Sequence, residues 1–514
     1  MAGMLMVAVA LPLSNYLMSL GQFIMAGGWL LCARLNARIS NAMRHPFFLL
    51  FAGLYLLHLT GLLITEDMAY AMKDLRIKLP LLLLPLLFFS APELPVSFVR
   101  WAFLLLMGAV LASTLAGAAV AAGWTHRQVH DFRDLSLFIS HIRLSLLIVL
   151  AVALAAWFFH QRREQLVRAG LVLYAAWMIG FLVLLQSITG LLIGGMLIMI
   201  GLSFVARKSG PLVKAVSIVL LLSGIYGSYS LYRYVFVDSL VLPERPISGL
   251  PVLTARGNVY HYDTTRIDIE NGRYVWMQYN ELEMDTAWRL RSSHSVWNKD
   301  AQGHMLLVTL ARYLTYKDYG RDAGGIARLT DEEVKQIEHG YPTPEDARQG
   351  GGLPSRLREL ATEYRTWYYD GWASGHSLAQ RLEYWKTARG IWLQQPWTGV
   401  GTGDVQTAFD EAYRQNNSRL EDPFRKRAHN QYLTMAVTFG WFGLLYFIFL
   451  LLSLFRRAIR SGSPVFVAFV VIAAGSFLSE DTLETQAGVT FFAFLSCLFL
   501  LHPSALSGRD TEMR

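Results

Sequence analysis

The sequence predicts an all-α polytopic membrane protein of about 12 transmembrane helices, with one large mixed, mainly α insert before the last three helices. Of the 514 residues, 54% are hydrophobic and only 16% are charged, whereas a soluble protein of this size has about 25% charged residues. The apolar residues also lie in blocks, many of them near the roughly 20 residues that cross a bilayer. The predicted spans are 4–19, 21–33, 47–64, 79–91, 98–122, 144–159, 169–187, 189–206, 212–232, 431–454, 464–479 and 487–502.

The basic residues of the short loops predict the orientation, because cytoplasmic loops are enriched in Lys and Arg. With a cytoplasmic amino terminus, the inside loops are the more basic ones, and the last outside turn (SEDTLETQ) is acidic. We therefore expect spans one to nine in 1–232, a non-cytoplasmic insert at 233–430, and spans 10 to 12 in 431–502. The tail at 503–514 is then cytoplasmic, and in a bacterial inner membrane the insert is periplasmic. The inside loops contain Arg34, Arg38, Arg44, Arg162, Arg163, Arg168, Arg207, Lys208, Lys214, Arg456, Arg457 and Arg460.

The composition argues against several classes of partner and cofactor. The net charge of +8 lies largely in membrane loops, so we expect membrane lipids as neighbours and no nucleic acid. Cys32 and Cys497 lie in or beside apolar segments, and no zinc-type Cys–His spacing occurs. His126, His130 and Asp131 have a spacing compatible with one helix face, but a solvated loop explains them better than a metal site. We expect no metal and no cofactor.

The insert is predicted to be a folded domain with a catalytic segment at 377–430. The alternating stretch GRYVWMQY at 272–279 indicates short strands. The stretch TDEEVKQIEHG at 330–340 indicates a helix, with Thr330 and Glu333 as a capping box.

Two residues of the catalytic segment are the main candidates for chemistry. Arg381 lies on a Trp-rich predicted helix, and a guanidinium group binds phosphate oxygens in pairs; the alternative is an ordinary salt bridge. His429 follows a basic run and precedes a new apolar helix. Histidine titrates near neutral pH, which suits a general base or a hydrogen-bond donor; the alternative is an interfacial histidine that caps a helix.

Five further residues are candidates for binding an anionic group. Gly401 and Gly403 lie in the turn PWTGVGTGD (396–404), whose backbone amides are able to form an anion nest, although most such turns are only turns. The turn lacks the Lys-Ser/Thr of a P-loop, so ATP is not expected. Arg143, Arg76 and Lys78 begin apolar helices on the same predicted side as the histidine. They either line a site for an anionic lipid or extend to lipid headgroups.

Three features follow one another in the sequence: Arg381 before a Trp-rich helix, then PWTGVGTGD, then HNQYL leading into FGWFGLL. This ordered set resembles the core of the bacterial O-antigen ligase and polymerase superfamily. The resemblance is specific over 377–445, and the insert resembles a long-insert branch. It implies a metal-independent, inverting glycosyltransferase that uses a glycan linked to undecaprenyl diphosphate. His429 then matches the motif histidine and Arg381 the arginine that contacts the diphosphate. Asn430, next in the motif, becomes a candidate substrate-binding residue.

The resemblance leaves the acceptor open. It implies ligation to lipid A–core first, and an O-antigen or exopolysaccharide polymerase or a protein O-oligosaccharyltransferase as alternatives. The sequence departs from the family at 186–190 (QSITG), where the family often has an arginine. Either Arg143 or Arg76 supplies this cation, or the family's second phosphate contact is absent. A lipid or polysaccharide transporter also fits about 12 helices, but transporters place charges or broken helices within the membrane, and here the charges lie outside. A sensor or scaffold is a third possibility.

Overall fold

The computed structural model describes residues 1–514 except 33–34, 92–93, 126–131, 245–248, 350–351 and 502–514. The chain divides into two compact units. The first, here the bundle unit, consists of Met1–Ser217 together with Arg381–Arg514. The second, here the insert unit, is Ile218–Gln380. Residues 381–430 therefore pack with the bundle unit rather than with the rest of the region predicted as the insert.

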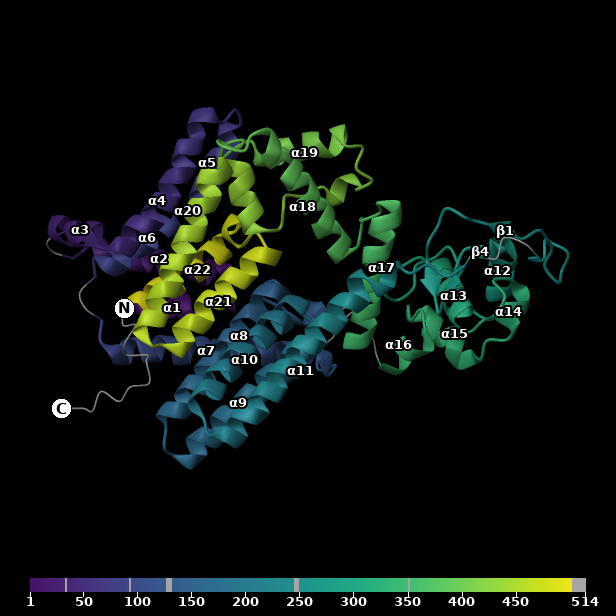
Figure 1. The fold of residues 1–514 in the computed structure, drawn as a ribbon, viewed down its shortest axis with the longest axis horizontal. Helices are drawn as coiled ribbons and strands as arrows, with labels where there is room; N and C mark the ends of the chain where they lie inside the picture. The colour runs from purple at the N-terminus through teal and green to yellow at the C-terminus, as the bar shows by residue number, and fades with distance from the viewer. Residues whose placement is uncertain (33–34, 92–93, 126–131, 245–248, 350–351, 502–514) are drawn as a thin grey trace. The chain divides into compact units, whose positions relative to one another are not determined.

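The bundle unit is built from helices (Figure 1). They are α1 (Ala2–Ala10), α2 (Asn15–Leu30), α3 (Leu35–Arg44), α4 (Pro46–Thr60), α5 (Met68–Lys78), α6 (Pro80–Phe89), α7 (Val96–Ala121), α8 (His141–Gln161), α9 (Gln165–Leu184), α10 (Ile188–Lys208), most of α18 (Ser377–Gln394), α19 (Val405–Gln415), α20 (Gln431–Ser461), α21 (Pro464–Ser479) and α22 (Gln486–Leu501). Helix α11 (Pro211–Phe236) runs from the bundle unit into the insert unit.

The helical membrane architecture is confirmed, but the predicted number of spans is not. Within the described residues, seven helices are long and apolar enough to cross a membrane, or eight if α2 and α3, bent by 118°, form one broken span. The difference has a structural cause. Helix α1 has only nine residues and ends at Ala10, just before Pro12, and α6, α21 and α22 have 10, 16 and 16 residues. Such helices are shorter than the roughly 20 residues of a full crossing.

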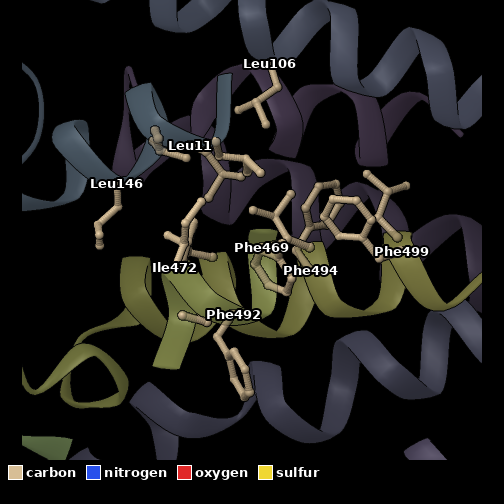
Figure 2. Packing of buried hydrophobic residues seen from close by; sticks show 14 of the residues in the cluster. Leu11, Leu106, Leu146, Phe469, Ile472, Phe492, Phe494 and Phe499 are labelled. Carbon is tan, nitrogen blue, oxygen red and sulfur yellow. The ribbon is translucent and has the colours of Figure 1, made fainter. Parts of the chain in front are cut away.

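The core of the bundle unit surrounds the short helices α21 and α22. Figure 2 shows Phe492, Phe494 and Phe499 of α22 beside Phe469 and Ile472 of α21, with Leu11, Leu106 and Leu146 around them. Almost every residue of α22 is buried. A helix that is apolar on all sides fits such a position. By contrast, only 17%, 11% and 6% of the most apolar windows of α9, α10 and α11 are buried within the protein.

The insert unit combines two short antiparallel strand pairs with small helices, as its mixed sequence pattern predicts. The region 272–279 forms strands, and the 330–340 helix has its predicted capping box, so both local predictions are confirmed. Strand β1 pairs with β4 and β2 with β3. The elements are β1 (His261–Tyr262), β2 (Ile269–Glu270), β3 (Arg273–Tyr274), β4 (Met277–Tyr279), α12 (Glu281–Trp288), α13 (Leu306–Tyr316), α14 (Ala323–Ala327), α15 (Asp331–Glu338), α16 (Pro344–Gln349) and α17 (Leu353–Asp370).

Candidate functional site

The site forms around a short acidic loop, residues 480–485, between α21 and α22. Its three carboxylates, Glu480, Asp481 and Glu484, each contact a different set of residues. All of the residues described below lie in the bundle unit.

Glu480 joins the two residues that the sequence singles out. Nη2 of Arg381 lies 2.9 Å from Oε1 of Glu480, and Nδ1 of His429 lies 3.9 Å from Oε2 of the same carboxylate. Nε of Arg381 also donates to the backbone oxygen of Ser479 at 3.1 Å. The three side chains are partly accessible, with 24%, 34% and 25% of Arg381, His429 and Glu480 exposed. We call these three residues the Arg–Glu–His cluster.

The charges in the cluster keep Glu480 ionised. Burial alone would raise the pKa of Glu480, but its interaction with His429 and the charge of Arg381 together lower it below its ordinary value. The distance of 3.9 Å to His429 is long for a hydrogen bond. The two side chains are therefore close neighbours in this structure, without a direct hydrogen bond of ordinary length.

Asp481 fixes the backbone from which His429 projects. Its two carboxylate oxygens accept the backbone N–H groups of His429 at 3.0 Å and of Asn430 at 2.9 Å, and Thr434 donates its hydroxyl at 2.7 Å. His429 has φ of 45°, a left-handed conformation that residues other than glycine rarely adopt. The ring of Tyr384 stacks on its imidazole, with centroids 5.6 Å apart. Backbone and ring together determine where the imidazole lies.

Asn430 begins α20 and does not point to an open site. Its side-chain oxygen accepts the backbone N–H of Leu433 at 3.1 Å, which is an N-cap contact. Its amide nitrogen donates to the backbone oxygen of Leu478 at 3.1 Å. The structure thus gives the Asn430 side chain a positioning role between α20 and the end of α21.

Lys78 lies in a second group of charges, here the buried ion network. Nζ of Lys78 lies 2.5 Å from Asp74 and 2.9 Å from Glu484, and Arg427 lies 3.0 Å from the same Glu484 oxygen. Gln431 donates to the other Glu484 oxygen at 3.3 Å. Only 1% of the Lys78 side chain is exposed. Lys78 is therefore enclosed by protein carboxylates, and the geometry does not support its predicted contact with an anionic substrate.

Of the two arginines proposed to replace the family arginine, Arg143 is the one beside the cluster. Its Nη2 donates to the Thr485 hydroxyl at 2.9 Å, and it interacts electrostatically with Glu480. Arg76 is exposed on α5. The 186–190 segment begins α10, and the hydroxyl of its Thr189 contacts Ser479 at 3.4 Å. This segment thus contacts Ser479, whose backbone oxygen accepts the hydrogen bond from Arg381.

The glycine-rich turn is docked onto neighbouring backbone. The N–H of Gly401 donates to the carbonyl of Thr438 at 3.0 Å, and the N–H of Gly403 donates to the Thr65 hydroxyl at 3.1 Å. At Gly399, with φ of 66°, a Cβ atom would lie 2.3 Å from the carbonyl carbon of Thr438. Because the amides of Gly401 and Gly403 already have protein acceptors, the geometry does not support an anion nest here. It supports a structural turn.

Sequence reasoning missed the role of the acidic loop, although it placed SEDTLETQ on the same side as His429. That placement was the available signal, since carboxylates commonly pair with arginine and histidine side chains. His126, His130 and Asp131 lie outside the described residues. Within the described part of the chain, no group of three or more His, Cys, Asp or Glu side chains is arranged to hold a metal ion.

Comparison with known proteins bears on one segment of the chain. No curated protein matches the chain. Residues 350–448 match the family model described as O-Antigen ligase. This segment contains Arg381, the glycine-rich turn, His429 and the first half of α20, as the sequence resemblance predicts. The match supports membership of the chain in the O-antigen ligase superfamily.

Proposed function

We propose that the protein is a membrane glycosyltransferase that moves a glycan from undecaprenyl diphosphate to an acceptor hydroxyl on the periplasmic side of the bacterial inner membrane. Membership of the O-antigen ligase superfamily supports glycan transfer of the ligation or polymerisation type. The observation that supports a site for this reaction is the Glu480 carboxylate, which contacts both Arg381 and His429.

Arg381 and Arg143 are the proposed contacts of the donor diphosphate. Ser479 and Glu480 orient the guanidinium of Arg381, and Thr485 orients that of Arg143. When the sugar leaves, negative charge grows on the diphosphate, and fixed positive groups stabilise that charge without reorganising. These two arginines supply such groups, so the proposed reaction needs no metal ion.

His429 is the proposed base for the acceptor. The acceptor oxygen attacks the anomeric carbon from the face opposite the diphosphate, which makes the transfer inverting. A new C–O bond forms as the bond between the anomeric carbon and the phosphate oxygen breaks, and the bonding electron pair leaves with undecaprenyl diphosphate. The proton of the acceptor hydroxyl passes to the imidazole, and ionised Glu480 stabilises the imidazolium that results.

The acceptor that we propose is lipid A–core, with a second lipid-linked repeat unit or a protein hydroxyl as alternatives. A transporter fits the site less well, because its charged residues would line a path across the membrane. Here the Arg–Glu–His cluster gathers at helix ends and in the loop between α21 and α22.

The decisive experiment offers purified lipid-linked glycan to the full-length protein in lipid nanodiscs, with lipid A–core, lipid-linked repeat unit or a Ser/Thr-rich peptide as acceptor. We expect product on lipid A–core, at the same rate with and without a chelator. Elongated lipid-linked glycan would instead identify a polymerase, and glycopeptide would identify a protein transferase. The absence of product with every acceptor would overturn the glycosyltransferase proposal.

A further inference from the structure

The insert unit contains a cavity that the proposed reaction does not use. Its volume is about 390 Å³, which lies within the range of small-molecule sites. Tyr260, Tyr274 and Tyr319 line it, together with Met277 and Leu250. The wall of the cavity therefore includes aromatic and apolar residues.

The aromatic walls are fixed in place by contacts behind them. The hydroxyl of Tyr260 donates to Asp322, and that of Tyr274 donates to the backbone oxygen of Pro243 at 3.2 Å. The guanidinium carbon of Arg328 lies 4.1 Å from the centre of the Tyr319 ring. Tyr260 and Tyr274 are largely buried, with 8% and 5% exposed, so they make a preformed wall of which only a small part is open to a ligand, and a preformed wall lowers the entropy cost of binding.

The charged residues of the lining are two arginines and two acidic residues, so their formal charges cancel. They are Arg273, Arg321, Asp318 and Glu244. Arg273 lies 3.0 Å from Asp318, with 48% and 66% of the two side chains exposed. The guanidinium of Arg321 donates to the backbone oxygens of Met277 and Gln278. Because protein acceptors already engage both guanidinium groups, the cavity is poorly suited to a phosphate or another strong anion.

Two residues of the lining have a backbone conformation that favours glycine. Gln278 in β4 has φ of 64°, and Asp318, which follows α13, has φ of 57°. The N–H of Tyr319 donates to the carbonyl of Leu314 at 2.9 Å, so Asp318 occupies a helix-end position where glycine is the usual residue. Both positions instead have a polar side chain at the cavity, despite the unfavourable backbone conformation. An amide and a carboxylate at these points are suited to hydrogen-bonding a ligand.

We propose that this cavity is a binding site for a neutral saccharide. The C–H faces of a sugar ring pack on aromatic side chains, and its hydroxyl groups both donate and accept hydrogen bonds. Tyr319, which is only partly buried, offers the first kind of surface, and the side chains of Gln278 and Asp318 offer the donors and acceptors for the second. The cavity is formed by residues of the insert unit, and the Arg–Glu–His cluster by residues of the bundle unit. The choice of glycan rests on the proposed function, which makes the sugar chain of the donor or product the natural occupant.

The test measures binding of lipid-free polysaccharide, released by mild acid from the lipopolysaccharide of the source bacterium, to the full-length protein by isothermal titration calorimetry. The variants are Gln278→Gly and Asp318→Gly, which remove a side chain and relieve its backbone, so that misfolding does not explain a loss. The matched control is Asn271→Gly, which makes the same kind of change at φ of 47° at a residue that does not line the cavity.

We expect saturable binding to the wild type, weakened at least tenfold in Gln278→Gly and in Asp318→Gly and unchanged in Asn271→Gly. Binding to His429→Ala must equal that of the wild type, so this result separates the cavity from the transfer reaction. Unchanged affinity in both cavity variants, or no saturable binding to the wild type, would overturn the proposal. Competition by inorganic pyrophosphate would also overturn it, since it would identify an anion site.

Discussion

The acidic loop supports two groups of charges that differ in their exposure to solvent. Glu480 contacts Arg381 and His429, and all three side chains are about a quarter to a third exposed. Four residues away, Glu484 contacts Lys78 and Arg427, with 1% of Lys78 and 5% of Glu484 exposed. The residue types are nearly the same. A substrate is able to reach the first group, whereas the second is surrounded by protein.

Residue type and spacing in the sequence therefore do not distinguish the Arg–Glu–His cluster from the buried ion network, whereas exposure to solvent does. A buried ion pair whose charges lack other partners is costly, so removing one member destabilises the fold. A partly exposed pair contributes little to stability and remains available for chemistry. We therefore expect substitutions in the buried ion network to change stability, and substitutions in the Arg–Glu–His cluster to change catalysis.

The largest expected effect on stability is that of Lys78→Met. The substitution leaves Asp74 and Glu484 buried with only Arg427 to balance them, at a cost of about 3–5 kcal/mol. The midpoint of denaturant unfolding in detergent measures this change. The control is Lys73→Met on the same helix, where the side chain is exposed and the expected change is within about 0.5 kcal/mol. Equal midpoints for the two variants would contradict the distinction between the two groups.

A smaller effect, on rate alone, is expected from Glu480→Gln. This substitution keeps the shape of the side chain but removes its charge. A hydrogen bond to a charged group is worth about 1.5–3 kcal/mol, so we expect transfer to slow roughly 10- to 100-fold. The initial rate of glycan transfer measures the loss. An unchanged rate would remove Glu480 from the mechanism, and a large drop in the unfolding midpoint would make its role structural.

A further expected effect, of about 1 kcal/mol, is on the pH dependence of stability, and Asp74→Asn tests it. Burial raises the pKa of Asp74 from 3.8 to about 6, although the charge of Lys78 opposes the shift. Between these two values the folded protein binds a proton that the unfolded chain does not, so the stability from this group falls as pH rises through the window. Asp74→Asn should remove that dependence, which is of the order of 1 kcal/mol. Unfolding midpoints at pH 5 and pH 7 measure it, and an unaltered difference would contradict the prediction.

Glu484 should show the opposite dependence on pH. Burial would raise the pKa of Glu484, but the charges of Lys78 and Arg427 lower it well below its ordinary value. Its contribution to stability is present above the unfolded pKa and is lost as pH falls below about 4.5. In Glu484→Gln, this loss at acid pH should disappear from the unfolding midpoints.

The sequence predicts the helical membrane fold and the region of the site, because apolar blocks and a local motif are properties of contiguous residues. Arg381 and His429 both lie in one matched segment and were found in this way. Glu480 lies in a different part of the chain and meets them only through the packing of α18, α20 and α21, which no local pattern encodes. For the same reason the enclosure of Lys78 by Asp74 and Glu484 was not predicted.

The number of spans and the glycine-rich turn were harder to predict for other reasons. Hydropathy predicts apolar segments but not the length of the continuous helix that each one forms, which is 16 residues for α22 and nine for α1. A turn with several glycines exposes its amides only if no neighbouring backbone accepts them. In this protein the carbonyl of Thr438 and the hydroxyl of Thr65 do so.

The most direct test of the account is the initial rate of glycan transfer by Arg381→Ala, His429→Ala and the double variant. The matched control is Arg389→Ala, an exposed arginine on the same helix. We expect each single variant to lose at least about 100-fold in rate, the double variant to lose little more than the worse single one, and Arg389→Ala to resemble the wild type. All four proteins should unfold at the wild-type midpoint. Transfer at the wild-type rate by either single variant would contradict the claim that the Arg–Glu–His cluster is the site of the reaction.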